Sequence, residues 1–535
     1  MNTDYTITVN GDTVTGLLCT GRKGWDCVLE NKTGGKRTRK AVCVMEIGSS
    51  ALRMGVYQLG RSGISRLDLL EYPLRLGHEV FAEGRISADS VRELSLALKG
   101  YTQVMKEYGV TEYRAIATTA LRESANRAYV VDQLRIRNGL TVEVLENGEE
   151  SALIYSALLG TPLTADSALL SYIGTGSVGA AACENGVVVR DCHMKLGFLK
   201  LSEMLGSLED QTSRYDRALE EYVDAYFQRL PLRLGERRFL RLILTGRELD
   251  TIAGLCGAKE KDGAYLLGRD RLSALYHQAS HRDTFAAARQ FGLPEETADQ
   301  LLPMLAIYLK MMEFTEADEI VAPVLDILDI VGGMMLSPEK KQRFEEGRAA
   351  GAMACARELA TVNGADPDHA ERIRGYAVQL FDRTKKLHGI AGRRRLLLEC
   401  AALLHELGNR VNARSATLAT YDLIKQSNFY GLNEEDALLT AEIIRFGDAS
   451  GALTAKQQLL TNKLAALLLL ADALDESRRG KIIDLKLRLE EEQLVVTARG
   501  REELLLERWA VEECAPYFEE VYGVRPVFVE KSNLL

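Results

Sequence analysis

Two glycine-centred turns, each flanked by apolar strand-like segments, constrain the fold of this 535-residue chain more than any other feature. They lie within residues 42–59 and 168–189, more than a hundred residues apart. Each consists of an apolar strand, then Ile-Gly-Ser-Ser or Ile-Gly-Thr-Gly-Ser, then a second strand rich in small or β-branched residues. Most glycine turns only close a hairpin. Two of them in this order and spacing predict a pair of phosphate-binding turns.

The chemistry of the turns supports this interpretation. Glycine permits a positive φ and lets backbone N–H groups approach a ligand without a Cβ between them, and a neighbouring serine adds a hydroxyl donor. Both kinds of donor suit phosphate oxygens. The candidate phosphate-binding residues are Gly48, Ser49 and Ser50 in the first turn, and Gly174, Thr175, Gly176 and Ser177 in the second.

Composition agrees with a large protein of several ordinary domains. Apolar residues make up 46% of the chain and charged residues 27%, so each domain can bury a core. The length predicts about three or four domains. The formal net charge of −9 argues against a general nucleic-acid binder, whereas a polyanionic substrate needs only a local basic site.

Cysteine usage and apolar runs indicate the compartment. The nine cysteines are odd in number and scattered, and none forms a CxxC pair, which favours reduced thiols over disulfides or a zinc site. The longest apolar runs are too short for a membrane span. The N-terminus has neither a basic start nor an apolar core, so it is not a secretory signal. We therefore expect a cytoplasmic protein without a membrane partner.

Periodicity divides the chain into four parts. Residues 1–40 form a β-rich extension with an Asn-Gly turn and a linker that ends in a basic stretch. Residues 41–165 alternate strands and helices, including a helix with Ser87 as N-cap and Gly109 as stop. Residues 166–340 form a second α/β lobe, and the two lobes look like a distant duplication. Helices predominate in the last part, residues 345–535, which closes in a small α+β tail.

Further motifs then follow in a recognisable order. They are AIATTALRESAN (115–126), VEVLENGEESALIYSALLG (142–160), KLGFLKLSEML (195–205) and LILTGRELDTIAGL (242–255). From about residue 41 to the end, the chain resembles the exopolyphosphatase and guanosine pentaphosphate phosphatase (Ppx/GppA) family. The resemblance implies an α/β fold with two actin-like (RNase H-like) lobes, followed by a mostly α-helical HD-like domain and the α+β tail. It also makes a homodimer plausible.

The resemblance assigns roles in the cleft between the lobes. Glu150, the second glutamate of NGEESALIY, is the candidate general base that orients water, with its neighbour Glu149 as the fallback. Glu46 stands where relatives usually have an aspartate and would help to hold a Mg²⁺ or Mn²⁺ cofactor. Arg122 occupies the arginine position of the ATxALR signature and would offer a bidentate fork to phosphate; the alternative for Arg122 is a surface ion pair.

The second turn departs from the family pattern. Relatives carry Asp-Ile-Gly-Gly-Gly-Ser-Thr-Glu, whereas this chain has Tyr172 at the aspartate position and Gly179 at the glutamate position. A phenol is a poor ligand for a hard divalent ion, and glycine has no side chain. Two functions therefore stay open: a hydrolase that releases terminal phosphate from inorganic polyphosphate or guanosine pentaphosphate, and a weakened or inactive sensor that only binds such ligands. A third alternative, a sugar or acetate kinase of the same superfamily, is disfavoured by GEESALIY and the HD-like region.

The helical part contains a second candidate metal site. Its positions match the ligands of metal-dependent HD enzymes at His369, His405, Glu406 and Asp472. The alternative is that these residues only cap and pair within a helical bundle. Cationic residues are also frequent in this part of the chain. They either face solvent separately or line a channel for long polyphosphate. These residues are Arg383, Lys385, Lys386, Arg393, Arg394, Arg395, Arg478, Arg479 and Lys481.

Overall fold

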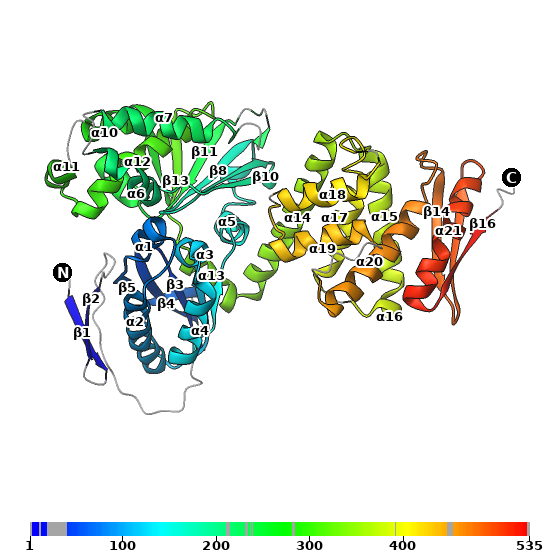
Figure 1. Ribbon diagram of the computed structural model, residues 1–535, viewed down its shortest axis with the longest axis horizontal. Coiled ribbons are helices and arrows are strands. Elements are labelled where there is room, and N and C mark those ends of the chain that lie inside the picture. The colour runs from blue at the N-terminus through cyan, green and yellow to red at the C-terminus, as the bar shows by residue number, and fades with distance from the viewer. Residues whose placement is uncertain are drawn as a thin grey trace. The chain divides into compact units, whose positions relative to one another are not determined.

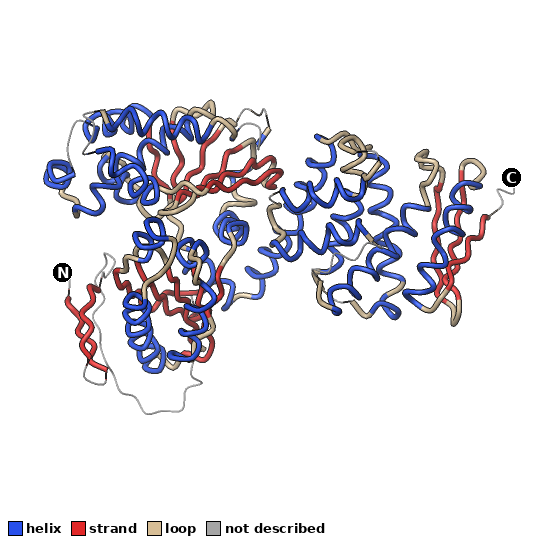
Figure 2. The backbone as a smooth tube through the Cα atoms, in the orientation of Figure 1, coloured by secondary structure: helices blue, strands red, loops and turns tan. Residues whose placement is uncertain are grey.

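The chain forms two compact units in the computed structural model shown in Figures 1 and 2. The first unit consists of Met1–Val187 and Asp191–Gly347, and the second of Val188–Arg190 and Arg348–Leu535. The structure describes residues 3–9, 12–18, 40–61, 63–209, 214–230, 234–235, 237, 239–280, 284–390, 392–412, 414–427, 429–446 and 453–531.

The first lobe of the first unit is built on a five-stranded sheet of order β5-β4-β3-β6-β7. The strands β3 (Ala41–Ile47), β4 (Ala51–Gly60) and β5 (Gly63–Pro73) form an antiparallel meander. The strands β6 (Val110–Ala117) and β7 (Val142–Val144) continue the sheet in parallel with β3. The helices are α1 (Leu76–Glu83), α2 (Ala88–Glu107), α3 (Thr119–Glu123), α4 (Arg127–Asn138) and α5 (Asn147–Ser156).

Local sequence explains these elements. Every residue of β3 is buried, as its nearly continuous apolar run predicts for a central strand covered on both faces. Ser87 is the N-cap of α2, where its side chain accepts a hydrogen bond from the backbone N–H of Ser90. Gly109 follows α2 with φ +63°, which a glycine adopts without strain. The predicted helix is therefore confirmed at both ends.

The second lobe repeats this topology. Its sheet has the order β10-β9-β8-β11-β13-β12, so the first five strands follow the same pattern as the first lobe, and β12 is added at the edge. The lobes are thus a structural duplication, as expected. The strands are β8 (Ala168–Ile173), β9 (Val178–Glu184), β10 (Val187–Met194), β11 (Arg241–Thr245), β12 (Ala264–Gly268) and β13 (Glu319–Pro323). The helices are η1 (Pro162–Thr164), α6 (Phe198–Glu209), α7 (Tyr215–Phe227), α9 (Leu249–Leu255), α10 (Arg269–Ser280), α11 (Thr284–Phe291), α12 (Glu295–Met312) and α13 (Ile327–Leu336).

The first-lobe sheet has a hydrophobic core on each face. One core contains Met45 and Leu94, the latter from α2. The other contains Val44 together with Leu153 from α5 and Leu328 from α13. These two cores hold the carboxyl end of β3, and with it the first glycine turn, in a fixed position.

The second unit, as expected, is mostly helical and ends in a small α+β tail. In the tail, β14 pairs antiparallel with β15, and β15 pairs parallel with β16. No helix among the described residues combines the length and apolar character needed to cross a membrane. The elements are α14 (Pro338–Val362), α15 (Pro367–Arg383), α16 (Lys385–His388), α17 (Arg394–Leu404), α18 (Ala416–Gln426), α19 (Glu434–Arg445), α20 (Ala455–Ala473), β14 (Ile482–Leu489), β15 (Gln493–Gly500), α21 (Leu505–Tyr522) and β16 (Arg525–Glu530).

The N-terminal extension contains the expected strands, because β1 (Thr3–Val9) pairs antiparallel with β2 (Asp12–Leu18). Its Asn-Gly turn and most of the basic stretch lie outside the described residues. The last residue of that stretch, Lys40, forms an exposed ion pair with Glu112 at 2.5 Å. The four sequence-based domain boundaries remain our proposal for how the two units subdivide.

Candidate functional site

The two glycine turns close in the same way. The N–H of Gly48 donates to the carbonyl of Ala51 at 2.9 Å, and the N–H of Gly174 donates to the carbonyl of Ser177 at 2.9 Å. An N–H group used in this way is not available to a phosphate oxygen. Gly48 and Gly174 therefore form the turns, which corrects the expectation that their N–H groups bind phosphate.

The first turn retains a donor suited to a ligand. The hydroxyl of Ser49 is buried and has no hydrogen-bond partner among the described residues. The carbonyls of Ser49 and Ser50 are used, because they accept from the N–H groups of Gly77 and Leu74 at 2.8 and 2.9 Å. Since a buried hydroxyl is rarely left unsatisfied in a protein, the Ser49 Oγ is the best phosphate contact of this turn.

The second turn packs directly against the first lobe. A Cβ placed on Gly176 would lie 2.4 Å from Thr119 Cγ2 and 2.5 Å from Phe81 Cζ, so only glycine fits. The hydroxyls of Ser177 and Thr119 are 3.5 Å apart. The carbonyl of Thr175 accepts from the N–H of Lys200. The structure thus brings the second turn to the α3 side of the cleft, next to Arg122.

Glu150 is a buried carboxylate next to Arg122. It lies in the first turn of α5, where the helix dipole favours a negative charge, and only 3% of its surface is exposed. Arg122 Nη1 binds Glu150 Oε2 at 2.9 Å. Arg122 also donates to the carbonyl of Leu145 and to Thr119 Oγ1, both at 2.8 Å. Arg122 therefore orients Glu150 in a buried ion pair rather than offering a free fork or pairing at the surface.

Glu149 has a structural role at the start of α5. It is the N3 residue of a capping box, in which its carboxylate accepts from the N–H of Glu146 at 3.3 Å. This arrangement stabilises the start of α5. Glu149 therefore serves the helix, and the structure favours Glu150 over this fallback.

Tyr172 changes the electrostatics around Glu150. Burial raises the pKa of Tyr172 well above its ordinary value, the charges of Glu150 and Glu46 raise it further, and the phenol hydrogen-bonds to Glu150. Tyr172 therefore stays protonated and donates to the Glu150 carboxylate. The strand that leads into the second turn therefore presents a neutral hydrogen-bond donor to Glu150.

Gly179 lies directly opposite Tyr172 in the β8–β9 ladder. A Cβ placed on Gly179 would be 2.9 Å from Ser151 Oγ and 3.1 Å from the Tyr155 hydroxyl oxygen. The space that a glutamate side chain needs is thus filled by the polar ends of two α5 residues. The packing of α5 against β9 therefore leaves no room for a side chain at Gly179.

We expect that Gly179→Glu fails to restore a carboxylate site and lowers stability by about 1–3 kcal/mol, because the added side chain overlaps Ser151 and Tyr155. Denaturant unfolding and phosphate release would be measured together. The matched control is Gly206→Glu, since a Cβ at Gly206 in α6 meets nothing within 4 Å. A stable Gly179→Glu variant with increased phosphate release would contradict this expectation.

The carboxylate of Glu46 forms an ion pair with Arg53 and is therefore not a free metal ligand. The two side chains are 3.0 Å apart on neighbouring strands, and both are buried. Burial raises the pKa of Glu46, and the charge of Arg53 opposes this rise. Arg53 also pairs with Asp326 and lies 3.7 Å from Glu71. The Glu46 carboxylate is therefore part of a charge network that holds α13 against the sheet.

The first unit does not provide the ligands that a resident Mg²⁺ or Mn²⁺ needs. Glu46 and Glu150 belong to separate ion pairs, and Tyr172 is neutral. Among the described residues of this unit, no three histidine, cysteine or carboxylate groups come close enough to share an ion. The expected metal site at Glu46 therefore has no preformed three-ligand set among the described residues, and no catalytic step is assigned to a metal here.

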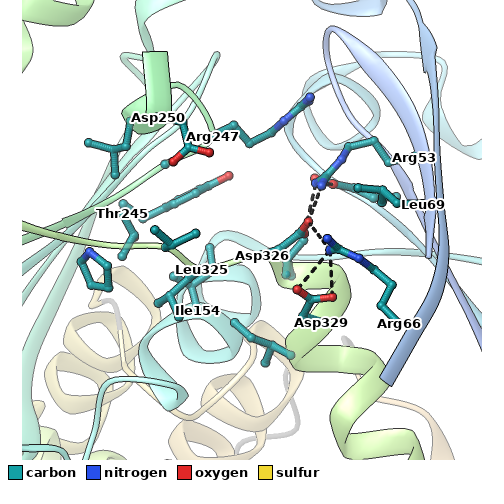
Figure 3. A pocket seen from close by; sticks show the side chains of 18 of the residues that line it. Arg53, Arg66, Leu69, Ile154, Thr245, Arg247, Asp250, Leu325, Asp326 and Asp329 are labelled. Atoms are coloured by element: carbon teal, nitrogen blue, oxygen red, sulfur yellow. Dashed lines mark hydrogen bonds and ion pairs between the residues drawn. The ribbon is translucent and has the colours of Figure 1, made fainter. Parts of the chain in front are cut away.

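A cavity of about 350 Å³ lies between the lobes at Glu46 and Tyr172. Figure 3 shows Arg53 and Arg66 extending toward Asp326 and Asp329. Five carboxylates line it against three arginines, so the cavity interior disfavours a polyanion. A phosphate chain is therefore expected near the glycine turns rather than in this cavity. The carboxylates are Glu46, Glu71, Asp250, Asp326 and Asp329, and the arginines are Arg53, Arg66 and Arg247.

Replacing Arg122 by methionine is expected to lower the free energy of unfolding by about 3–5 kcal/mol, because it leaves the buried Glu150 charge without its partner. The check is urea denaturation of the variant. Arg114→Met is the control: Arg114 pairs with Glu143 at 2.9 Å on the surface, where about 0.2–1 kcal/mol is expected. Similar losses in both variants would argue against a special role for the Arg122–Glu150 pair.

The second unit contains a separate group of potential metal ligands. His369 from α15, His405 at the end of α17 and Asp472 from α20 each offer one ligand atom, and these atoms lie within 4.8 Å of one another. The Nε2 atoms of His369 and His405 are 3.4 and 3.5 Å from Asp472 Oδ1. The structure thus brings together three residues that are far apart in the sequence.

Outer contacts fix both imidazole rings. His369 Nδ1 donates to Asp475 at 2.8 Å, and His405 Nδ1 donates to the carbonyl of Ala402 at 2.8 Å. With a proton on each Nδ1, both Nε2 atoms face the group, where Asp472 Oδ1 is the nearest carboxylate oxygen. Carboxylate or carbonyl acceptors behind the ligating histidines are typical of metal centres.

Glu406 is not part of this group, which corrects the expected four-ligand set. Both of its oxygens bind the guanidinium of Arg478, one of them at 3.1 Å from Nη1, and Asn409 adds a third contact at 3.2 Å. A carboxylate held in this bidentate way is withdrawn from a metal. The extra methylene of glutamate, relative to aspartate, gives the reach to Arg478.

Ion pairs engage most of the cations that could line a polyphosphate channel in the helical part. Arg393 and Arg394 both bind Asp436, and Arg395 binds Glu399. Of the nine cations, seven are in ion pairs, so their charges are largely neutralised where they stand. The other four pairs are Lys385–Asp382, Arg478–Glu406, Arg479–Glu502 and Lys481–Glu507.

Two duplicated α/β lobes with glycine turns at their cleft define a protein of the actin-like class. Within that class, the chain belongs to the Ppx/GppA phosphatase family. The model of this family matches residues 57–322, and that of Ppx/GppA phosphatase, domain III, matches residues 353–512. The second match concerns the family's own third domain, so the HD-like interpretation of this region stays a prediction.

Solved structures similar to this chain include two relatives. One is a Ppx/GppA family member from Aquifex aeolicus, with 19% identity, a TM-score of 0.48, and coverage of 55% of this chain and 97% of that chain. Another is an exopolyphosphatase from Cytophaga hutchinsonii, with 18% identity, a TM-score of 0.49, and coverage of 55% and 97%. The family assignment rests on the two family matches.

Proposed function

We propose that this protein is an exopolyphosphatase-like hydrolase that releases terminal phosphate from inorganic polyphosphate or guanosine pentaphosphate. The observation that carries the proposal is the buried carboxylate of Glu150, which Arg122 and Tyr172 hold in one orientation at the cleft. Family membership supports phosphoanhydride hydrolysis as the reaction.

In this reaction, Glu150 orients a water molecule and accepts its proton as the water oxygen bonds to the terminal phosphorus. The anhydride P–O bond breaks, and the shortened chain leaves with the bridging oxygen. The Ser49 hydroxyl is the proposed donor to the phosphate oxygens. Arg122 keeps Glu150 in place throughout, since three of its five N–H donors are bonded to Leu145, Glu150 and Thr119.

A second candidate function is binding without turnover. The Glu150 carboxylate already accepts hydrogen bonds from Arg122 and Tyr172, which occupy part of its capacity to bind a water molecule. Tyr172 and Gly179 face each other on β8 and β9, and neither supplies a carboxylate. Such a site suits a sensor that binds polyphosphate or a guanosine polyphosphate and signals through another part of the chain.

The deciding experiment measures phosphate release and binding on the same preparation. Long-chain polyphosphate and guanosine pentaphosphate would be supplied separately, with and without Mg²⁺ or Mn²⁺. Phosphate release from either one supports the hydrolase and identifies its substrate. Tight binding without release supports the sensor, and absence of both contradicts the proposed function.

The second unit is proposed to bind one divalent transition-metal ion through His369, His405 and Asp472. Imidazole and carboxylate donors suit zinc, manganese and iron. With three protein ligands and Glu406 withdrawn, such an ion retains an open position for water. A cytoplasmic location and a homodimer are further proposals, the latter testable by sedimentation.

A further inference from the structure

His78 in α1 contacts a carboxylate with each of its two ring nitrogens. Its Nδ1 atom pairs with Glu203 Oε1 of α6, and its Nε2 atom lies 2.8 Å from Glu296 Oε1 of α12. Helix α1 belongs to the first lobe, whereas α6 and α12 belong to the second. The three side chains therefore join the two lobes, and none of the roles described above uses them.

Helix α1 also covers the first glycine turn at this place. His78 follows Gly77, whose N–H donates to the carbonyl of Ser49 at 2.8 Å. A Cβ placed on Gly77 would lie 2.7 Å from Ser49 Cβ and 2.9 Å from Leu199 Cδ2, so α6 reaches the first turn here (Figure 1). The Ser49 hydroxyl is buried in this packed arrangement. A phosphate oxygen can reach it only after neighbouring groups move, and α6 is the neighbour that comes from the other lobe.

The two carboxylates determine which form of the imidazole satisfies the contact. An ionised carboxylate only accepts hydrogen bonds, and a neutral imidazole has a single N–H. Only an imidazolium, with two N–H donors, therefore satisfies both Glu203 and Glu296. The His78 side chain is 18% exposed, so protons exchange between the ring and solvent. A neutral ring leaves one of the two carboxylates without its donor.

The other charged groups around α1 do not replace His78. Helix α1 packs against α6 and α3, and α6 packs against α12. Lys200 of α6 binds Glu123 of α3 at 2.6 Å, a second ion pair between the lobes, but lysine and glutamate ordinarily titrate far from neutral pH. The remaining charged groups are Arg122, which binds Glu150, Glu79, which accepts from Ser87 and Ser90, Asp299, which accepts from Ser202 and Thr284, and the exposed Glu83 and Glu295.

We propose that His78, Glu203 and Glu296 form a proton-dependent clasp between the lobes, which holds the cleft closed over the Ser49 hydroxyl while the ring is an imidazolium. Protonation stabilises the closed arrangement, so the clasp is complete at low pH. It weakens as the pH rises through the range in which histidine ordinarily titrates, about pH 5 to 8. The same opening admits a phosphate chain to the first turn. Only this last role rests on the proposed function.

The test measures the separation of the lobes without any substrate. Dyes would be attached through noncanonical amino acids at Tyr129 of α4 and Phe285 of α11, which are 73% and 60% exposed. Single-molecule energy transfer would be recorded in the full chain at about pH 5.5 and about pH 8.5, where glutamate is ordinarily ionised throughout. We expect the ratio of open to closed molecules to rise about fivefold at the higher pH, in line with the loss of one partly exposed ion pair.

Four variants assign the effect to the clasp. His78→Gln, which carries no charge, is expected to show the higher ratio at both pH values, and His78→Lys, a permanent cation, the lower ratio at both. Glu296→Gln is expected to raise the ratio, whereas the control Glu295→Gln, one position earlier, leaves it unchanged.

The clasp is overturned by a ratio that does not depend on pH in the unmodified chain. A pH response that persists in His78→Gln, or equal effects of Glu296→Gln and Glu295→Gln, would also overturn it. Because no substrate is present, absence of phosphate release contradicts the proposed function and leaves the outcome for the clasp unchanged.

Discussion

Replacing Glu150 by glutamine is expected to lower phosphate release by roughly 10²–10⁴-fold, the usual contribution of a general base. Glutamine keeps the shape of the side chain and can still accept from Arg122, but it cannot take the proton of the attacking water. Binding of polyphosphate is expected to persist, because the Ser49 hydroxyl is unchanged. Malachite-green detection of phosphate and equilibrium binding of the same ligand would check both parts.

The neighbouring residue provides a matched control for this experiment. Glu149→Gln changes the same chemical group one position earlier, and its carboxylate only caps α5. Its expected effect is confined to stability, at about 1 kcal/mol or less, since glutamine also serves in a capping box. If both variants lost activity equally, or if Glu150→Gln kept full activity, Glu150 would not be the base.

Removing one imidazole from the proposed metal centre is expected to lower its affinity for a divalent cation by more than about 100-fold. This exceeds the roughly 10–100-fold effect of losing an outer contact. His405→Ala is the better variant, because His369 also holds the buried Asp475 and its loss would disturb the fold. Chelator-treated protein would be titrated with Zn²⁺ and, separately, Mn²⁺ by calorimetry, with one ion expected per chain.

Glu406→Gln distinguishes the observed three-ligand group from a four-ligand site. Because Glu406 is bound to Arg478, this variant is expected to change metal affinity much less than His405→Ala does. A loss as large as that in His405→Ala would show that Glu406 is a ligand after all. An unmodified chain that takes up no ion would contradict the metal centre itself.

Much of the fold follows from local patterns in the chain. The two Ile-Gly turns, the Ser87 cap and the alternation of strands and helices depend on contacts between residues close in sequence. The prediction that the lobes are duplicated is confirmed because the pattern of strands recurs, and the strand orders agree. Glu150 was singled out from its motif, and its role stays a prediction; the structure shows that it is buried beside Arg122.

The missed features share one property: they depend on a charged group whose partner is distant. Glu46 and Arg53 illustrate this, because their ion pair forms only when β3 and β4 pair in the sheet. Asp475 was missed as well, although it lies three residues after Asp472 and holds His369.

The sequence by itself determined the two glycine turns, the repeated α/β pattern and the family, because short-range periodicity and turn chemistry specify local structure. Only the tertiary structure decided which charge each side chain meets. Glu46 meets Arg53, Arg122 is taken by Glu150 rather than left for phosphate, and Glu406 is held by Arg478 rather than a metal. The partner that each charged side chain contacts depends on its reach, its burial and the packing around it. These are defined only after the helices and strands have packed together.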